Sequence, residues 1–173
     1  MLIYNNSRMY RQAIREDIPE IQALARSIWE EAYNEILSKQ QIDYMLEIMY
    51  SGEVLNKEFS AGVVWDLILD LGNPCGYLSY SLEDDNSVKL SKIYIEKESR
   101  GKAITGDSIR RVVEYAVKNC RDNVFLTVNK NNKRAVRAYE KRGFTIAASV
   151  VTDIGNGFVM DDYIMKYFVK TGK

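Results

Sequence analysis

The sequence predicts a single α+β domain over residues 1–173, built on a mixed, mostly antiparallel sheet. Two patterns carry this prediction. Seven short runs alternate apolar and polar residues or are rich in β-branched and aromatic residues, which is typical of strands. Four other runs repeat apolar residues every three or four positions, which is typical of helices. Their order is β-α-α-β-β-β-α-β-α-β-β, with a β-α-β crossover in the middle. A chain of 173 residues is long enough to bury one sizeable core.

The N-terminal part begins with an alternating run, MYRQAI (9–14), which predicts a strand. Asp17 and Glu20 have the spacing of a capping box, and Pro19 suits the first turn of the helix that follows. One apolar stripe runs along this helix, formed by Ile18, Ile21, Leu24, Ala25, Ile28 and Ala32. The stripe predicts that one face of the helix packs on the core.

A second helix is predicted between Ser38, which has a capping-box partner in Gln41, and Gly52, which we expect to end it. Three strands should follow as an antiparallel meander, because turn-forming residues separate runs that are rich in β-branched and aromatic residues. The three runs are GVVWDLIL (62–69), CGYLSYSL (75–82) and VKLSKIYI (88–95).

The C-terminal part alternates helices and strands. A helix is predicted over about 104–119, and a shorter one between Asn132 as N-cap and Gly143 as its stop. Between them, the composition of NVFLTV (123–128) predicts a strand buried on both faces. The chain closes with two further predicted strands, TIAASVV (145–151) and DYIMKYFV (162–169).

The composition excludes several kinds of site. Without histidine the chain cannot carry a Ser-His-Asp triad, a Cys-His pair or a His-based metal site. Its two cysteines, Cys75 and Cys120, are too few for structural zinc, and we expect both to be reduced core thiols. No apolar stretch reaches the roughly 20 residues of a membrane span, the N-terminus lacks signal-peptide order, and no nucleic-acid-reading motif appears. The expectation is a cytoplasmic protein without a metal, membrane or nucleic-acid partner.

Charge is unevenly distributed along the chain. Residues 1–90 hold 7 Lys or Arg against 15 Asp or Glu, whereas residues 91–173 hold 17 against 9. This asymmetry predicts a cationic partner for the N-terminal half and an anionic partner for the C-terminal half. The alternative is that both halves carry solvated helix faces and attract each other.

A loop of small residues, RGKAITG (100–106), joins a predicted strand to a predicted helix. A helix N-terminus presents unpaired N–H groups and a partial positive charge, and both attract a pyrophosphate. Arg100 and Lys102 add charge, and the Thr105 hydroxyl could donate to a phosphate oxygen. Ala103 stands where glycine would be expected, and its methyl group costs little if its φ is negative. The loop therefore predicts a pyrophosphate cradle, with a weakened or lost cradle as the alternative.

Three features make the chain similar to the GCN5-related N-acetyltransferases. They are a strand entering an Arg-x-x-small-x-small loop (LSKIYIEKESRGKAITGDSI), a segment with Asn-x-x-Ala, Tyr and Gly-Phe (FLTVNKNNKRAVRAYEKRGF), and the element order. The resemblance covers nearly the whole chain and is closest to bacterial spermidine/spermine-type (PaiA-like) enzymes. It implies transfer of an acetyl group from acetyl-CoA to a primary amine, on a sheet splayed at the cofactor cleft.

The resemblance also implies site residues. Tyr139 would protonate the departing thiolate of CoA, with a core aromatic as the alternative. Asn132, two helical turns earlier, would bind the cofactor arm, with helix capping alone as the alternative. The implied cofactor-binding set is Ile93, Tyr94, Ile95, Arg100, Gly101, Lys102, Ala103, Ile104, Thr105, Gly106, Asn132 and Lys141.

The N-terminal helical region would supply the acceptor site. We expect an aromatic and acidic wall suited to a polyamine, formed by Trp29, Glu30, Glu31, Tyr33 and Glu35. The alternatives are a solvated acidic helix face, a protein or peptide amine, or another small amine. Glu31 is the first candidate for general base, with Tyr33, Glu35, Tyr94 or a chain of waters left open. A homodimer and a non-catalytic module of the same fold also stay open.

Overall fold

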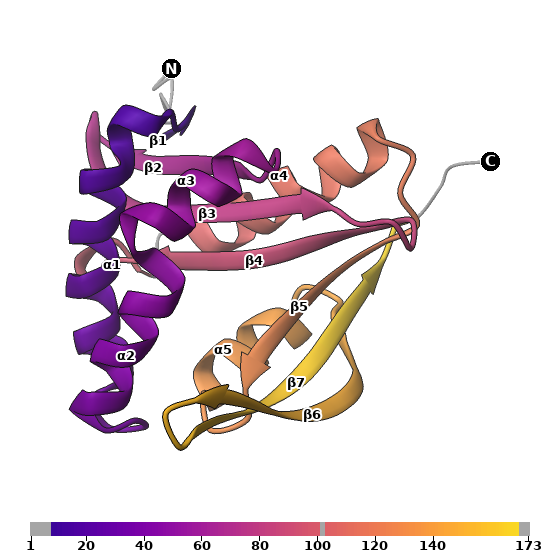
Figure 1. Cartoon of the computed structure of the whole chain (residues 1–173). Coiled ribbons are helices and arrows are strands. Elements are labelled where there is room, and N and C mark those ends of the chain that lie inside the picture. The colour runs from indigo at the N-terminus through magenta and orange to yellow at the C-terminus, as the bar shows by residue number, and fades with distance from the viewer. Residues whose placement is uncertain (1–7, 101–102, 170–173) are drawn as a thin grey trace. The chain divides into compact units, whose positions relative to one another are not determined.

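The computed structural model describes residues 8–100 and 103–169 and has the predicted α+β architecture (Figure 1). Its strands are β1 (Arg8–Gln12), β2 (Val64–Asp70), β3 (Asn73–Leu82), β4 (Ser87–Ile95), β5 (Asn123–Asn129), β6 (Thr145–Gly155) and β7 (Phe158–Phe168). Its α-helices are α1 (Ile18–Tyr33), α2 (Lys39–Tyr50), α3 (Gly52–Ser60), α4 (Ile104–Lys118) and α5 (Lys133–Glu140). The fold class and the predicted order of strands along the chain are confirmed.

The strands form one hydrogen-bonded series in the order β1-β2-β3-β4-β5-β7-β6. β4 and β5 are parallel, as a crossover through α4 requires, whereas β7 is antiparallel to both β5 and β6. The parallel register covers Ser87–Lys89 opposite Asn123–Phe125, while β5 pairs with β7 along all 7 of its residues. The splay at the cofactor cleft stays a prediction.

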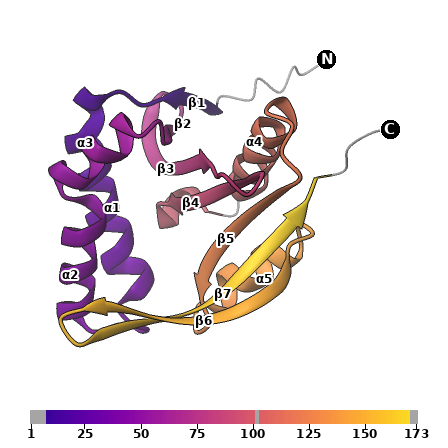
Figure 2. The same ribbon diagram turned by 45° about the vertical axis from the view of Figure 1, so that its right-hand side comes forward.

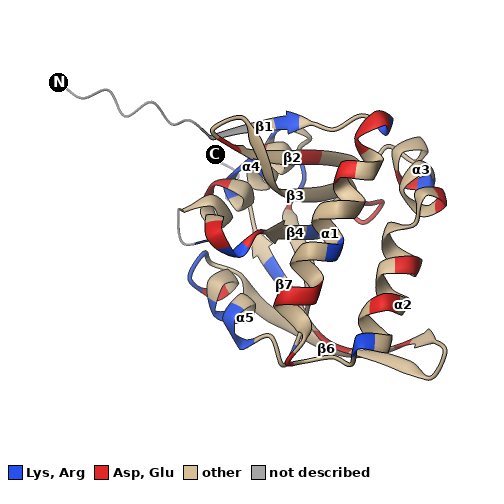
Figure 3. Ribbon diagram, turned by 90° about the vertical axis from the view of Figure 1, so that its left-hand side faces the viewer, with Lys and Arg blue, Asp and Glu red and all other residues tan. Residues whose placement is uncertain are grey.

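The chain folds as two compact units. The first contains the residues up to Ser79 together with Lys92–Thr105, and the second contains Tyr80–Ser91 and the residues from Gly106 onward. In the first unit α1 and α2 lie side by side (Figure 2). Acidic residues mark α2 and basic residues mark α5, in line with the division of charge along the sequence (Figure 3). That these units form a single domain stays a prediction.

The second predicted helix is found as α2, and an additional helix that was not predicted, α3, follows it directly. α2 begins after Ser38, whose Oγ accepts a hydrogen bond from the Gln41 N–H at 3.1 Å, so the predicted cap is confirmed. The chain then turns at Ser51, which has an extended ψ of 152°, and α3 starts at Gly52. The apolar pattern did not reveal α3, because Leu55 is the one residue of this helix that is fully buried.

Asp17 precedes α1 but does not form the predicted capping box. Its carboxylate accepts hydrogen bonds from the Arg11 guanidinium at 2.8 and 2.9 Å and from the Ile14 N–H at 2.8 Å. The bonds from Arg11 lower the pKa of Asp17. The side chain thus ties β1 to the turn before α1 instead of capping the helix, because a nearby guanidinium is the stronger donor.

Aromatic rings fill the core of the first unit. Trp29, Tyr50, Trp65 and Tyr77 are at most 2% exposed. The Tyr50 oxygen accepts from the Tyr77 hydroxyl at 2.9 Å and from the Trp29 Nε1–H at 3.2 Å. Burial raises the pKa of both tyrosines well above 10, because a phenolate would lose its hydration. These bonds satisfy polar atoms that would otherwise be costly to bury.

Lys92 of β4 is also buried in this core, at 5% exposure. Its ammonium lies 2.8 Å from a Glu58 carboxylate oxygen and 4.9 Å from the centre of the Trp65 ring. The other oxygen of Glu58 accepts from the Trp65 Nε1–H at 3.0 Å. Burial of this cation is tolerated because a carboxylate and an aromatic face replace its water.

Gly76 of β3 lies against the backbone of β4. A Cβ atom built at this position would overlap the carbonyl oxygen of Tyr94. The two strands can approach this closely only because residue 76 has no side chain.

In the second unit, β5 departs from its predicted environment. Val124, Leu126 and Val128 are buried, whereas Phe125 is half-buried and Thr127 exposed. The strand is therefore buried mainly on one face, and the expectation of burial on both faces was wrong. Cys120 is exposed in the turn after α4, which corrects its assignment as a core thiol, while Cys75 is buried as expected.

Candidate functional site

The predicted phosphate loop lies between β4 and α4. Gly101 and Lys102 fall outside the described residues. Arg100 is held by the first unit itself, because its Nε donates to the Ile95 carbonyl at 2.9 Å and its Nη2 lies 2.5 Å from Glu31. The Arg100 side chain as a whole is 18% exposed.

Ala103 has a φ of +63°. The sequence-based estimate of a small cost assumed a negative φ, and the structure overturns that assumption. In this left-handed region an L-residue crowds its own backbone by about 1–2 kcal/mol, whereas glycine does not. Ala103 thus has a backbone conformation typical of glycine while carrying a methyl group.

The first turn of α4 begins with Ile104, which is 1% exposed and accepts a hydrogen bond from the Tyr10 hydroxyl at 3.3 Å. Thr105 and Gly106 are half-buried. A Cβ on Gly106 would lie 3.1 Å from Nε and Nη2 of Arg142, so glycine there admits a guanidinium beside the helix start. Helix N-terminal N–H groups with an adjacent guanidinium fit a diphosphate chemically.

The strand expected to pair with the cofactor arm is the end of β4. Ile93 and Tyr94 are half-buried, and Ile95 is buried. The Tyr94 ring packs 5.4 Å from Trp29 and 5.6 Å from Tyr77, centre to centre. The side chains therefore belong to the core, and pairing with a ligand would use the backbone.

α5 carries the predicted acid and its partner. The Asn132 Oδ1 caps the helix by accepting from the Ala135 N–H at 3.1 Å, and this use leaves the Nδ2 group as the donor that could reach a cofactor. Tyr139 is 8% exposed, and its ring lies 5.7 Å from that of Phe144. Lys141 is exposed just after the helix. Capping is thus observed for Asn132, while binding stays a prediction.

The residues of the predicted acceptor wall lie in two different environments, some in the core and some at the surface. Trp29 and Tyr33 are 1% and 8% exposed, with ring centres 4.7 Å apart in the core, whereas Glu30 and Glu35 are exposed. The rings and the carboxylates therefore do not form one continuous surface in this structure. The Tyr33 hydroxyl lies 3.3 Å from that of Tyr94, so these two alternative bases share a hydrogen bond.

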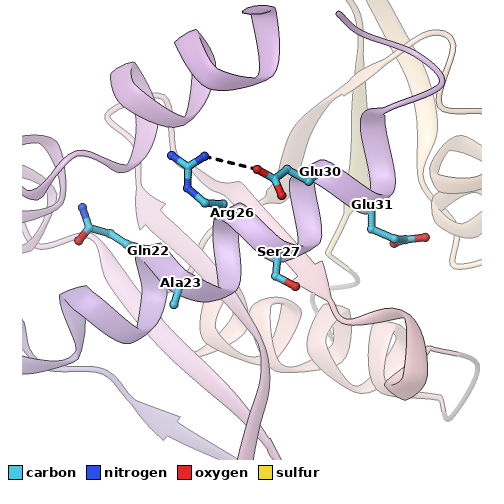
Figure 4. Close-up of a pocket in the computed structure, with 6 residues that line it drawn as sticks. All are labelled: Gln22, Ala23, Arg26, Ser27, Glu30 and Glu31. Carbon is cyan, nitrogen blue, oxygen red and sulfur yellow. Dashed lines mark hydrogen bonds and ion pairs between the residues drawn. The ribbon is translucent and has the colours of Figure 1, made fainter. Parts of the chain in front are cut away.

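A hollow of about 670 Å³ runs along the outer face of α1 (Figure 4). Its lining residues are Gln22, Ala23, Arg26, Ser27, Glu30 and Glu31. Arg26 pairs with Glu30, one helical turn further along α1, at 3.4 Å, while Glu31 points the other way and pairs with Arg100. The carboxylates in the hollow are thus already partly neutralised by arginine.

The sequence analysis did not predict a role for one buried carboxyl group, that of Asp162 in β7. It is 5% exposed, and its Oδ1 has no hydrogen-bond partner among the described residues. Burial, with Asp161 nearby, raises its pKa. The pair of aspartates within an apolar run, DDYIMKY, was the signal in the sequence. A buried carboxyl of this kind is a candidate proton acceptor.

The fold and these residues together define a class of protein: a mixed-sheet domain whose parallel strand pair is connected through a small-residue loop and a helix. The chain belongs to the acetyltransferase (GNAT) family, whose sequence model matches residues 18–144. That match includes the loop, Asn132 and Tyr139.

Curated relatives are similar over part of the chain. An uncharacterized N-acetyltransferase of Mycobacterium tuberculosis is 32% identical over 94 residues, which are 54% of this chain and 60% of that protein. The match therefore spans less than two thirds of that relative's length.

Solved structures support the fold. The PaiA N-acetyltransferase of Thermoplasma acidophilum, in complex with coenzyme A, has a TM-score of 0.79 at 20% identity, covering 93% of this chain and 98% of that one. A spermidine N-acetyltransferase of Vibrio cholerae, in complex with CoA and spermine, has a TM-score of 0.68 at 22% identity, covering 95% and 97%. None of the helices in the described part of this chain is long and apolar enough to cross a membrane.

Proposed function

We propose that this protein transfers the acetyl group of acetyl-CoA to the nitrogen of a primary amine. The observation that carries the proposal is the family match over residues 18–144, which includes the loop 100–106, Asn132 and Tyr139. The proposal includes a cytoplasmic location, as expected from the sequence. The cofactor-binding set predicted above stays part of the proposal, with Arg142 added because it lies against Gly106.

Acetyl-CoA supplies an activated thioester. The neutral acceptor amine forms a new C–N bond at the thioester carbonyl carbon and loses a proton to the general base or to water, and the C–S bond breaks. The phenol of Tyr139 gives its proton to the departing sulfur and recovers one from solvent. A phenol suits this transfer, because it can donate its proton and a thiolate is basic enough to accept it. Asn132 would orient the cofactor arm through its Nδ2 group.

For the acceptor we favour a polyamine or another small amine. The acidic character of the first 90 residues supports this choice, as do Glu30 and Glu35, which are exposed in and just beyond α1. The fold shared with the Vibrio cholerae spermidine N-acetyltransferase is consistent with it. A protein or peptide amine is the alternative, and thiol release measured with a panel of polyamines, amino acids and peptides separates the two.

For the general base we retain Glu31, with Asp162 as a second candidate. Glu31 is engaged by Arg100, whereas Asp162 has one oxygen without a protein partner in the described residues. Glu31→Gln and Asp162→Asn are therefore to be compared by the pH profile of kcat/KM. Loss of the acidic limb in one variant identifies the base, and an unchanged limb in both favours deprotonation through water.

Tyr139→Phe is the decisive test of the acid. General acid catalysis contributes about 10²–10⁴-fold, so we expect kcat to fall by at least about 100-fold. CoA affinity measured by calorimetry should change by less than about twofold, because the ring is retained. Tyr115→Phe, a half-buried hydroxyl deletion on α4, serves as the matched control and should keep full activity. Full turnover by Tyr139→Phe would remove this residue from the mechanism.

A non-catalytic module of the same fold is the second candidate, and the positive φ of Ala103 favours it. In that case acetyl-CoA would bind without thiol release for any amine in the panel. Absence of calorimetric binding even at millimolar acetyl-CoA would argue against both candidates.

A further inference from the structure

Arg100 lies in the turn through which the chain leaves β4. A short 3₁₀ helix, Lys97–Ser99, follows the strand, and the Arg100 N–H bonds to the Lys97 carbonyl at 3.2 Å. The same turn is joined to β3, because the Glu96 N–H donates to the Cys75 carbonyl at 2.9 Å. The backbone from which the Arg100 side chain starts is therefore fixed by two neighbouring strands.

The Arg100 guanidinium joins the end of β4 to helix α1. Its Nε donates to the Ile95 carbonyl at 2.9 Å, and its Nη2 lies 2.5 Å from Oε2 of Glu31. A planar guanidinium presents its donors in a fixed fork and so holds two acceptors at once, which a lysine ammonium does less well. Arg100 thus acts as a bridge between the strand and the helix.

This ion pair differs from the neighbouring one on α1. The Arg100 and Glu31 side chains are 18% and 38% exposed, whereas those of Arg26 and Glu30 are 58% and 49% exposed and lie 3.4 Å apart. Figure 4 shows Glu31 directed away from the Arg26–Glu30 pair. A shorter and less exposed pair is screened less by water, so the bridge of Arg100 is the stronger of the two.

Aromatic contacts support the same junction between α1 and β4. The Tyr33 hydroxyl lies 3.3 Å from the Tyr94 hydroxyl, and the Trp29 ring centre is 5.4 Å from that of Tyr94. The last turns of α1 therefore hold the end of β4 both through the core and through Glu31. This end of the strand, Ile93–Ile95, is the part proposed to pair with the cofactor arm.

We infer that Arg100 is a positioning residue for acetyl-CoA, which acts through Glu31 and not by contact with the diphosphate. The inference rests on the proposed function. Binding of a phosphate by the same Nη2 would require the contact with Glu31 to break. Glu31 then sets the affinity for a cofactor that it does not contact, because its bridge to Arg100 holds Ile93–Ile95 in place for backbone pairing.

A double-mutant cycle tests the bridge through the affinity for CoA, measured by calorimetry. Glu31→Leu and Arg100→Met should each raise the Kd about tenfold, which is the order expected for one charge-assisted hydrogen bond. The double variant should bind no more weakly than Arg100→Met alone, because both changes break the same contact. Direct phosphate binding by Arg100 predicts instead that Glu31→Leu leaves CoA affinity unchanged or improves it.

The matched control is another arginine–carboxylate bridge in the same unit. Arg11 and Asp17 are joined by hydrogen bonds of 2.8 and 2.9 Å, which tie β1 to the turn before α1. Arg11→Met and Asp17→Ala should lower the unfolding temperature, yet keep the Kd for CoA within about twofold of the wild type. The comparison separates positioning of the cofactor from a general loss of stability.

Steady-state kinetics supplies a second readout. Arg100→Met should raise the KM for acetyl-CoA about tenfold, while the KM for the amine changes less than about twofold. Partial loss of folded protein would instead lower kcat and leave both KM values as they are. Thermal unfolding measured on the same preparations gives the folded fraction.

Wild-type CoA affinity in Glu31→Leu overturns the inference, and so does a double variant whose loss of affinity is the product of the two single losses. Equal and non-additive losses, with the Arg11–Asp17 control unaffected, support it. If the wild-type protein does not bind CoA, the inference and the proposed function both fail. If CoA binds but no amine is acetylated, only the proposed function fails, and the calorimetric cycle still decides the inference.

Discussion

At the scale of single residues, Ala103 has a backbone conformation that favours glycine. Ala103→Gly stabilises the folded state by about 1–2 kcal/mol, because it removes steric crowding. It also stabilises the unfolded state by about 0.4–1 kcal/mol, because glycine has more conformational entropy there. We therefore expect its free energy of unfolding to stay equal to or slightly above that of the wild type. Ala103→Val should lose about 2 kcal/mol, because a branched side chain is a poor fit at positive φ. Urea unfolding measures both, and a fully stable valine variant would contradict a positive φ.

The burial of some residues could be predicted from the sequence. The spacing that placed Ala25 and Ile28 on the buried stripe of α1 also places Trp29 and Tyr33 there, four and eight residues after Ala25. Assigning these rings to an exposed wall gave composition more weight than periodicity. The φ of Ala103, in contrast, depends on how the chain leaves β4, and no local pattern reveals it.

At the scale of elements, the start of α5 combines two roles in one side chain. Asn132→Ser keeps a capping oxygen but removes the Nδ2 donor, whereas Asn132→Ala removes both. We expect the serine variant to keep its stability within about 0.5 kcal/mol and the alanine variant to lose about 1 kcal/mol. Both should bind CoA more weakly by calorimetry if the amide contacts the cofactor. If the serine variant binds CoA with wild-type affinity, Asn132 serves only as a helix cap.

Strongly amphipathic elements were the easiest to predict. α4 was predicted over about 104–119 and is found at Ile104–Lys118, because its apolar stripe is regular. α3 was missed because it buries little, and the ends of β6 and β7 were missed because their exposed residues do not alternate in character. Elements that carry little of the core leave a weak signal in the sequence.

At the scale of the whole molecule, buried phenols make stability depend on pH. Burial raises the pKa of Tyr50 and Tyr77 above the unfolded value near 10, so the folded state holds these protons more tightly. Their contribution is fully present below pH 10 and is lost as pH rises beyond it. Above pH 10 the free energy of unfolding should fall by about 1.4 kcal/mol per pH unit for each phenol.

Tyr77→Phe isolates one of these phenols. Comparing unfolding at pH 8 and pH 11 cancels the constant cost of the lost hydrogen bond to Tyr50. The variant should show the smaller decrease between the two values. An equal decrease would show that other groups control the alkaline transition.

Strand order is the whole-molecule property that the sequence revealed least. β7 lies between β5 and β6, although it follows both in the chain. Hydrophobic period fixes which face of a strand is buried, but it does not say which strands are neighbours. Two ion pairs, Lys92 with Glu58 and Arg100 with Glu31, join the acidic and basic halves of the sequence. Part of the charge asymmetry is thus used within the protein itself.

The contact between Gly76 and the Tyr94 carbonyl has a practical consequence for anyone surveying variants. Every substitution at residue 76 must push apart two strands, one of which ends in the residues proposed to bind the cofactor. In a saturation screen, substitutions of this glycine would lower activity as strongly as substitutions at a catalytic position, although glycine has no side chain with which to take part in the reaction. Measuring the amount of soluble protein alongside activity would tell such a spacer from a true participant.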